Sequence, residues 1–155
     1  MKLSPSELEA YSENGFLIRR QVFHEQEVKA FRAAADSAAQ TAKIMAASSD
    51  ARRYLLDGNL FVDIGHTTVR FEHQENAGEI RVIEPVHEFH EQFMQLVHDP
   101  RLVSPMRQLV DSAEVALWTA KLNLKSSRVG SGFAWHQDTP YWVHDCDEAE
   151  RPPNV

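Results

Sequence analysis

Residues 114–125, Glu-Val-Ala-Leu-Trp-Thr-Ala-Lys-Leu-Asn-Leu-Lys, carry the clearest strand signal in the sequence. Side chains of a strand alternate between two faces, so this run would place small and apolar residues on one face. The other face would carry its polar residues, Thr119, Lys121, Asn123 and Lys125, together with Val115 and Leu117. Two interpretations of that polar face stay open. It lies in water, or it lines a barrel lumen where Lys pairs with a carboxylate and Asn or Thr binds a co-substrate.

Upstream of this run the apolar residues recur at helical spacing, which predicts helices at about 5–13, 25–45 and 86–110. Ser4 and Glu7 form a Ser-x-x-Glu capping box for the first helix, and Gly15 is placed to end it. The second helix is rich in alanine, which would allow close packing. Short strands are predicted at 16–23, 59–64 and 69–72, so helices come first and the longest strand late. This order predicts an α+β or mainly β domain with a helical cover.

Composition limits what the chain can be. Its 155 residues, 43% hydrophobic and 25% charged, suit one globular domain, residues 1–155. The 16 Lys+Arg against 23 Asp+Glu give a net charge of −7, which opposes binding to nucleic acid or to an anionic membrane. One cysteine allows no internal disulfide, and no signal peptide or membrane-spanning run is present. We therefore expect a cytoplasmic protein that binds neither nucleic acid nor a membrane; the oligomeric state stays open.

The chemistry is concentrated in residues 135–142, Trp-His-Gln-Asp-Thr-Pro-Tyr-Trp. His136 and Asp138 are two residues apart and would share one face of a strand. An imidazole and a carboxylate so placed supply two ligands of the 2-His-1-carboxylate triad that holds non-heme Fe(II). The alternative is a solvated His beside a turn Asp.

The aromatic residues around this pair also have two interpretations. Trp135, Tyr141 and Trp142 are either core aromatics or, with Gln137, the wall of a substrate pocket that keeps water from the metal. We expect Arg81, in an earlier apolar run, to be a surface charge.

Residues 130–142, Gly-Ser-Gly-Phe-Ala-Trp-His-Gln-Asp-Thr-Pro-Tyr-Trp, resemble the metal-binding segment of the phytanoyl-CoA dioxygenase family. Residues 11–18 and the spacing from residues 122–125 to the His are also similar to that family, and residues 118–142 look most like its ectoine-hydroxylase branch. The resemblance implies a double-stranded β-helix, a jelly-roll or cupin-like fold, that uses Fe(II), 2-oxoglutarate and O₂. It implies Fe(II) at His136 and Asp138, and it matches Lys125 to a lysine associated with 2-oxoglutarate. Asn123 and Thr119 would be further co-substrate contacts.

The sequence departs from the family after Asp138. The family's second His ligand and its 2-oxoglutarate-clamping Arg have no good match, since only His144 and Arg151 follow. We therefore expect the N-terminal part of an oxygenase, with a helical cover and short strands in 1–112 and the first barrel strands in 113–155. Two functions are carried forward: a dioxygenase that hydroxylates a small-molecule C–H bond, this chain alone being inactive, or a non-catalytic binding or interaction module on the same scaffold. No catalytic residue is assigned beyond the metal and cofactor positions.

Overall fold

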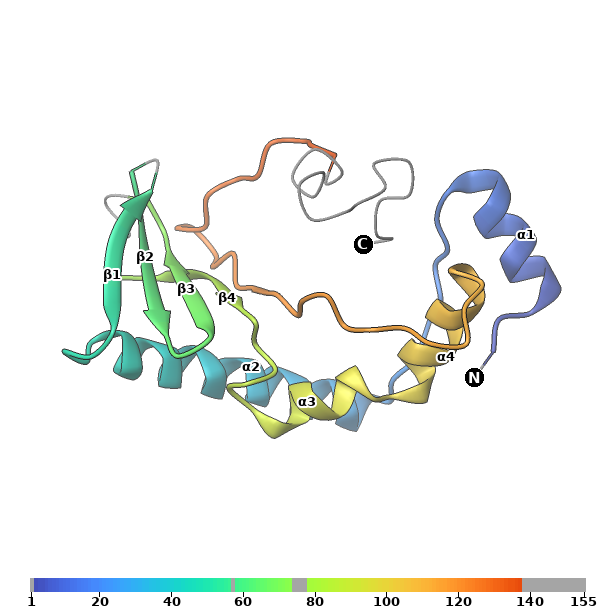
Figure 1. Ribbon diagram of the computed structural model, residues 1–155, viewed down its shortest axis with the longest axis horizontal. Coiled ribbons are helices and arrows are strands. Elements are labelled where there is room, and N and C mark those ends of the chain that lie inside the picture. Colours follow the sequence, from blue (N-terminus) through green and yellow to red (C-terminus); the bar gives the residue numbers. More distant parts are fainter. Residues whose placement is uncertain (1, 57, 74–77, 138–155) are drawn as a thin grey trace.

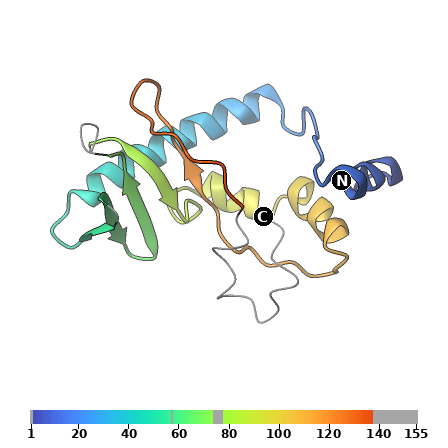
Figure 2. The same cartoon turned by 90° about the horizontal axis from the view of Figure 1, so that it is seen from above.

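The computed structural model describes residues 2–56, 58–73 and 78–137. Its elements are α1 (Pro5–Asn14), α2 (Glu25–Ala46), β1 (Arg52–Leu56), β2 (Asn59–Ile64), β3 (Thr67–Phe71), β4 (Ile80–Glu84), α3 (Glu91–Val97), α4 (Pro100–Leu109) and β5 (Leu122–Asn123). The sheet lies over one end of the long helix α2, while α1 and α4 lie toward its other end (Figure 1). The segment after α4 runs back to the sheet, where β5 joins β4 (Figure 2). Among the described residues, no helix is both long and apolar enough to cross a bilayer.

The sheet is antiparallel throughout, in the order β1-β2-β3-β4-β5, and it is not closed. One row of paired residues crosses it from Val62 to Val69, Ile83 and Leu122. The first three are at most 1% exposed and belong to the main core cluster. On α2, the buried residues are four alanines spaced by four, Ala34, Ala38, Ala42 and Ala46. The last three belong to that core, because an alanine stripe lets the helix backbone approach the sheet closely.

The opposite face of the sheet, which we call the far face, carries different residues. Its paired rows are Phe61, Arg70, Val82 and Asn123, and Asp63, Thr68 and Glu84. Their side chains point away from the core row because neighbours along a strand alternate between faces. The far face is therefore largely polar and charged.

The helix predictions hold where local capping signals define them. The Ser4 hydroxyl accepts from the Glu7 amide and the Glu7 carboxylate accepts from the Ser4 amide, while Gly15 ends α1 with φ +75°. The helix predicted at 25–45 is α2. The helix predicted at 86–110 is instead two helices, α3 and α4. Asp99 accepts from the Arg101 amide and Pro100 takes the first helical position, so a new helix begins there.

Several strand predictions are wrong. Residues 16–23 form no strand, and within 114–125 only Leu122–Asn123 does so. Residues 133–137 also form none, so the expected pairing of 114–125 with a His136 strand is not observed. The strands predicted at 59–64 and 69–72 are β2 and β3, whereas β1 and β4 were not predicted. A strand needs a hydrogen-bonding partner, which alternation alone does not provide. The described fold is α+β, and its sheet forms no jelly-roll.

Candidate functional site

Two residues of the predicted polar face converge on Glu84 at the end of β4. The Thr119 hydroxyl donates to Glu84 Oε1 over 3.1 Å. Lys121 Nζ lies 3.4 Å from Glu84 Oε2, and Arg70 Nη2 from β3 lies 2.9 Å from the same oxygen. The Glu84 side chain is only 17% exposed, so its charge is held by two cations in a partly desolvated position. Lys121 is thus paired with a carboxylate while its own side chain stays partly in water, so both interpretations of the polar face stay open.

The other predicted co-substrate residues are more exposed. Asn123 lies on the far face opposite Val82. Lys125 is exposed and has φ +27°, at the point where the chain leaves the sheet. The turn that follows is closed by the Gly130 amide, which donates to Ser126 O over 2.8 Å. A Cβ at Gly130 would lie 2.7 Å from that same oxygen, so only glycine fits there. The co-substrate roles of Thr119, Asn123 and Lys125 stay predictions.

His136 is the one predicted metal ligand among the described residues; Asp138 lies outside them. The His136 Nδ1 atom lies 2.7 Å from the carbonyl oxygen of Ala134. A carbonyl can only accept, so His136 donates from its Nδ1 atom in this contact. Metal-bound histidines commonly fix their tautomer in this way, so the chemistry of His136 fits an Nε2 ligand. Within the described ranges, no three His, Cys, Asp or Glu side chains are grouped to hold a metal.

The predicted substrate-pocket residues are only partly described. Trp135 is fully exposed and Gln137 is exposed. Tyr141 and Trp142 lie outside the described residues. The pocket role of these four residues therefore stays a prediction.

Two residues at the ends of β3 and β4 contact the loop that precedes His136. Glu72 is 2% exposed, and its Oε2 accepts from the Ser131 hydroxyl over 2.6 Å and from the Ser131 amide over 3.2 Å. Arg81 Nη2 donates to Gly132 O over 3.2 Å, and its guanidinium lies 4.0 Å from the centre of the Phe133 ring. The prediction that Arg81 is a surface charge is wrong, because its side chain is half-buried between these partners. The sequence signal that was missed is Glu72, a carboxylate directly after the buried run of β3.

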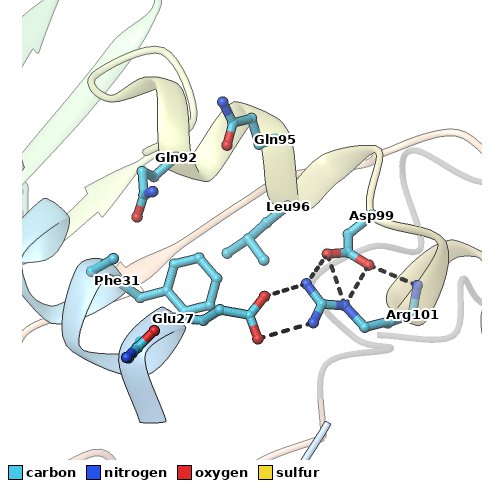
Figure 3. A pocket seen from close by; sticks show the side chains of 9 residues that line it. Glu27, Phe31, Gln92, Gln95, Leu96, Asp99 and Arg101 are labelled. Carbon is cyan, nitrogen blue, oxygen red and sulfur yellow. Dashed lines mark hydrogen bonds and ion pairs between the residues drawn. The ribbon is translucent and has the colours of Figure 1, made fainter. Parts of the chain in front are cut away.

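A cavity of about 320 Å³ lies between α2, α3 and the start of α4 (Figure 3). Arg101 contacts both Glu27 and Asp99 there, with Nη2 distances of 2.8 and 2.6 Å. These hydrogen bonds from Arg101 lower the pKa of both carboxyl groups. Because Arg101 pairs with both acids, which come from different elements, we interpret this network as a link between helices rather than a ligand site.

Comparison with known proteins finds a family match over most of the chain. Residues 11–155 match the sequence profile of a protein family described as phytanoyl-CoA dioxygenase (PhyH). An ectoine dioxygenase of Streptomyces avermitilis is 28% identical over 140 residues, which is 90% of this chain and 40% of that enzyme. An L-proline trans-4-hydroxylase of Streptomyces griseoviridis is 32% identical over 72 residues, 46% of this chain and 26% of that enzyme. An ectoine dioxygenase of Streptomyces coelicolor is 36% identical over 69 residues, 44% of this chain and 23% of that enzyme. The chain thus spans at most about two fifths of the length of these relatives.

Proposed function

We propose that this chain, which belongs to the phytanoyl-CoA dioxygenase family, is part of an Fe(II)- and 2-oxoglutarate-dependent dioxygenase. In this proposal the enzyme hydroxylates a C–H bond of a small molecule. The observation that carries the proposal is the family match, which covers residues 11–155 and so includes Trp135, His136, Gln137 and Asp138. The hydrogen bond from His136 Nδ1 to the Ala134 carbonyl supports it, because metal-binding histidines commonly donate from one ring nitrogen while the other ligates the metal.

In this proposal the residues predicted from the sequence have separate tasks. His136 and Asp138 hold the iron, whose bound form supplies the activation of O₂. Lys125 attracts a carboxylate of 2-oxoglutarate, and Asn123 and Thr119 contribute hydrogen bonds to it. The pairing of Lys121 with Glu84 keeps a second cation near this face while balancing its charge. A second His ligand and a carboxylate-binding Arg are expected from elsewhere in the protein.

The names of the relatives guide the choice of substrate. Two of these relatives are named for activity on ectoine and on L-proline, so these two compounds and their close analogues are the first substrates to test. The test uses the protein as its gene encodes it, purified and supplied with Fe(II), ascorbate and 2-oxoglutarate, with succinate and hydroxylated product as readouts.

We expect His136→Ala to abolish succinate formation. The matched control is His66→Ala, because His66 is an exposed turn residue after β2. Succinate formation that survives His136→Ala would overturn the proposal. If the unaltered protein shows no turnover and binds metal no better than His136→Ala, the non-catalytic module is favoured.

A further inference from the structure

The buried carboxylate of Glu72 is the starting observation. Glu72 directly follows β3, and its backbone amide donates to Glu79 O over 2.8 Å, which closes the β3–β4 connection. Its side chain is 2% exposed and binds both the amide and the hydroxyl of Ser131, a residue 59 positions later. A buried carboxylate is costly unless it is hydrogen-bonded. The contact with Ser131 therefore fixes one point of the later loop firmly against the sheet.

Arg81 fixes the next two residues of the same loop. Its Nη2 donates to Gly132 O, and its guanidinium stacks on the ring of Phe133. Its Nη1 lies 2.9 Å from His73 Nε2, so a neighbour of Glu72 in turn orients the guanidinium. A cation over an aromatic ring is attracted to the ring face, and here this attraction adds to a hydrogen bond. Three consecutive loop residues, 131–133, are thus held by the ends of β3 and β4.

The held residues lead directly to the imidazole. Ala134 follows Phe133, and its carbonyl accepts from the Nδ1 atom of His136. A continuous series of contacts therefore runs from Glu72 and Arg81, through residues 131–134, to the imidazole of His136. We propose that Glu72 and Arg81 are positioning residues that set the orientation and tautomer of His136. This inference rests on the proposed function, in which His136 is a metal ligand.

The loop that Glu72 and Arg81 contact lies outside the main core of the protein. In the part of the chain that the structure describes, residues 133–137 belong to no strand and all are exposed. The main core cluster is built from α2 and the other face of the sheet. Removing the Ser131 hydroxyl or the Arg81 guanidinium should therefore disturb the loop and leave that core intact.

The experiment uses the 155-residue chain labelled with ¹⁵N. The first readout needs no metal: the ring nitrogen shifts of His136 report its tautomer, and amide exchange reports the protection of Ser131. We expect Ser131→Ala, Glu72→Ala and Arg81→Ala to shift His136 away from the Nδ1–H form. Glu72→Ala should lower the protection of the Ser131 amide about tenfold or more, and Glu72→Gln should retain most of it because it keeps an acceptor oxygen. Ser127→Ala is the matched control, since Ser127 is an exposed serine of the same loop.

The second readout is the affinity for Co(II), used alone as a metal probe and measured against His136→Ala. We expect Ser131→Ala and Arg81→Ala to raise the Co(II) dissociation constant about tenfold, within the 10- to 100-fold range typical of outer contacts of metal ligands. An unchanged His136 tautomer and unchanged Co(II) affinity in these two variants would overturn the inference. If instead the unaltered chain binds Co(II) no better than His136→Ala, the proposed metal role fails, while the tautomer and Ser131 protection still decide whether Glu72 and Arg81 orient His136.

Discussion

Arg101 links the start of α4 to the start of α2 through its contacts with Glu27 and Asp99. Hydrogen bonds from Arg101 lower the pKa of both carboxyl groups below their ordinary values of 4.5 and 3.8. A carboxyl group whose pKa is lowered by folding stabilises the protein above its unfolded pKa, and this contribution is lost as the pH falls through the folded pKa. We predict that Arg101→Ala lowers the thermal midpoint clearly at pH 7, and that the difference from the unaltered chain shrinks between about pH 5 and pH 3. Thermal denaturation followed by circular dichroism measures both.

The control for this prediction is Lys29→Ala on α2. Lys29 pairs with Glu25 over 2.9 Å, but both side chains are largely exposed, so the pair contributes little at any pH. A pH-independent effect of Arg101→Ala, or an effect no larger than that of Lys29→Ala, would contradict the assignment of the network to stability.

Glu84 offers a second test on the far face. Glu84→Gln keeps an acceptor for the Thr119 hydroxyl but removes the charge that holds Arg70 and Lys121. We predict a loss of about 1 kcal/mol in the free energy of unfolding, because charge-assisted hydrogen bonds to a mostly buried carboxylate are lost. Urea denaturation measures it. The matched variant is Glu79→Gln, whose partner Lys43 and own side chain are half-exposed, so its loss should be smaller. Equal losses would show that burial of Glu84 is unimportant.

The same cluster shows what the sequence reveals of the site. Alternation in 114–125 identified Thr119 and Lys121 as neighbours on one face, because that property is local. Their common partner Glu84 lies 35 residues before Thr119, and its pairing depends on how β4 meets the later segment. Arg70 reaches Glu84 only through the register of β3 with β4. Residue types and spacing predicted the polar face, but the register that completes it is set by long-range strand pairing.

At the scale of elements, the alanine stripe of α2 determines how closely helix and sheet pack. Ala38 is fully buried and belongs to the core, whereas Ala33, on the same helix, is exposed. We predict that Ala38→Leu destabilises the fold by about 1–3 kcal/mol, because the added carbons have no space. Ala33→Leu should change the free energy of unfolding by less than about 0.5 kcal/mol. Chemical denaturation of both variants compares them, and similar losses would mean that α2 does not pack on the sheet through this stripe.

Helices and strands differ in how well they were predicted. The limits of α1 follow from residues within it and beside it, Ser4, Glu7 and Gly15, so a local pattern sufficed. Of the face that alternation in 114–125 predicted, Leu122 and Leu124 pack against the core, whereas Trp118 is 56% exposed. Alternation did not make residues 114–121 a strand. Among the described residues, the backbone bonds of this segment to the β4 side are the Ala120 carbonyl with Val86, the Leu124 amide with Arg81 and the short β5 ladder.

At the scale of the whole molecule, the sheet ends at β1 on one side and β5 on the other, and it does not close. Large apolar side chains near the β5 side are exposed, with Trp118 at 56%, Phe133 at 49% and Trp135 fully exposed. The aligned relatives are also more than twice as long as the matched region.

This leads to a prediction about the 155-residue chain by itself. After Asp138 its sequence contains only His144 and Arg151 as candidates for the remaining iron ligand and for the carboxylate-binding Arg. His144 is six residues from Asp138, a poor position for a ligand from an opposite strand. Without a charge-assisted contact from such an Arg, 2-oxoglutarate should bind about ten- to a hundredfold more weakly.

We therefore predict no turnover when this chain alone is incubated with Fe(II), ascorbate and 2-oxoglutarate, with succinate as the readout and a protein-free mixture as the control. Lys125 still offers a partner for a carboxylate, so weak 2-oxoglutarate binding without succinate is compatible with this outcome. Metal-dependent succinate above the control would contradict the prediction. In that case His144→Ala decides the cause: if it abolishes the succinate, His144 completes the iron site, and if it does not, the missing ligand is another residue of the chain that the sequence pattern did not identify.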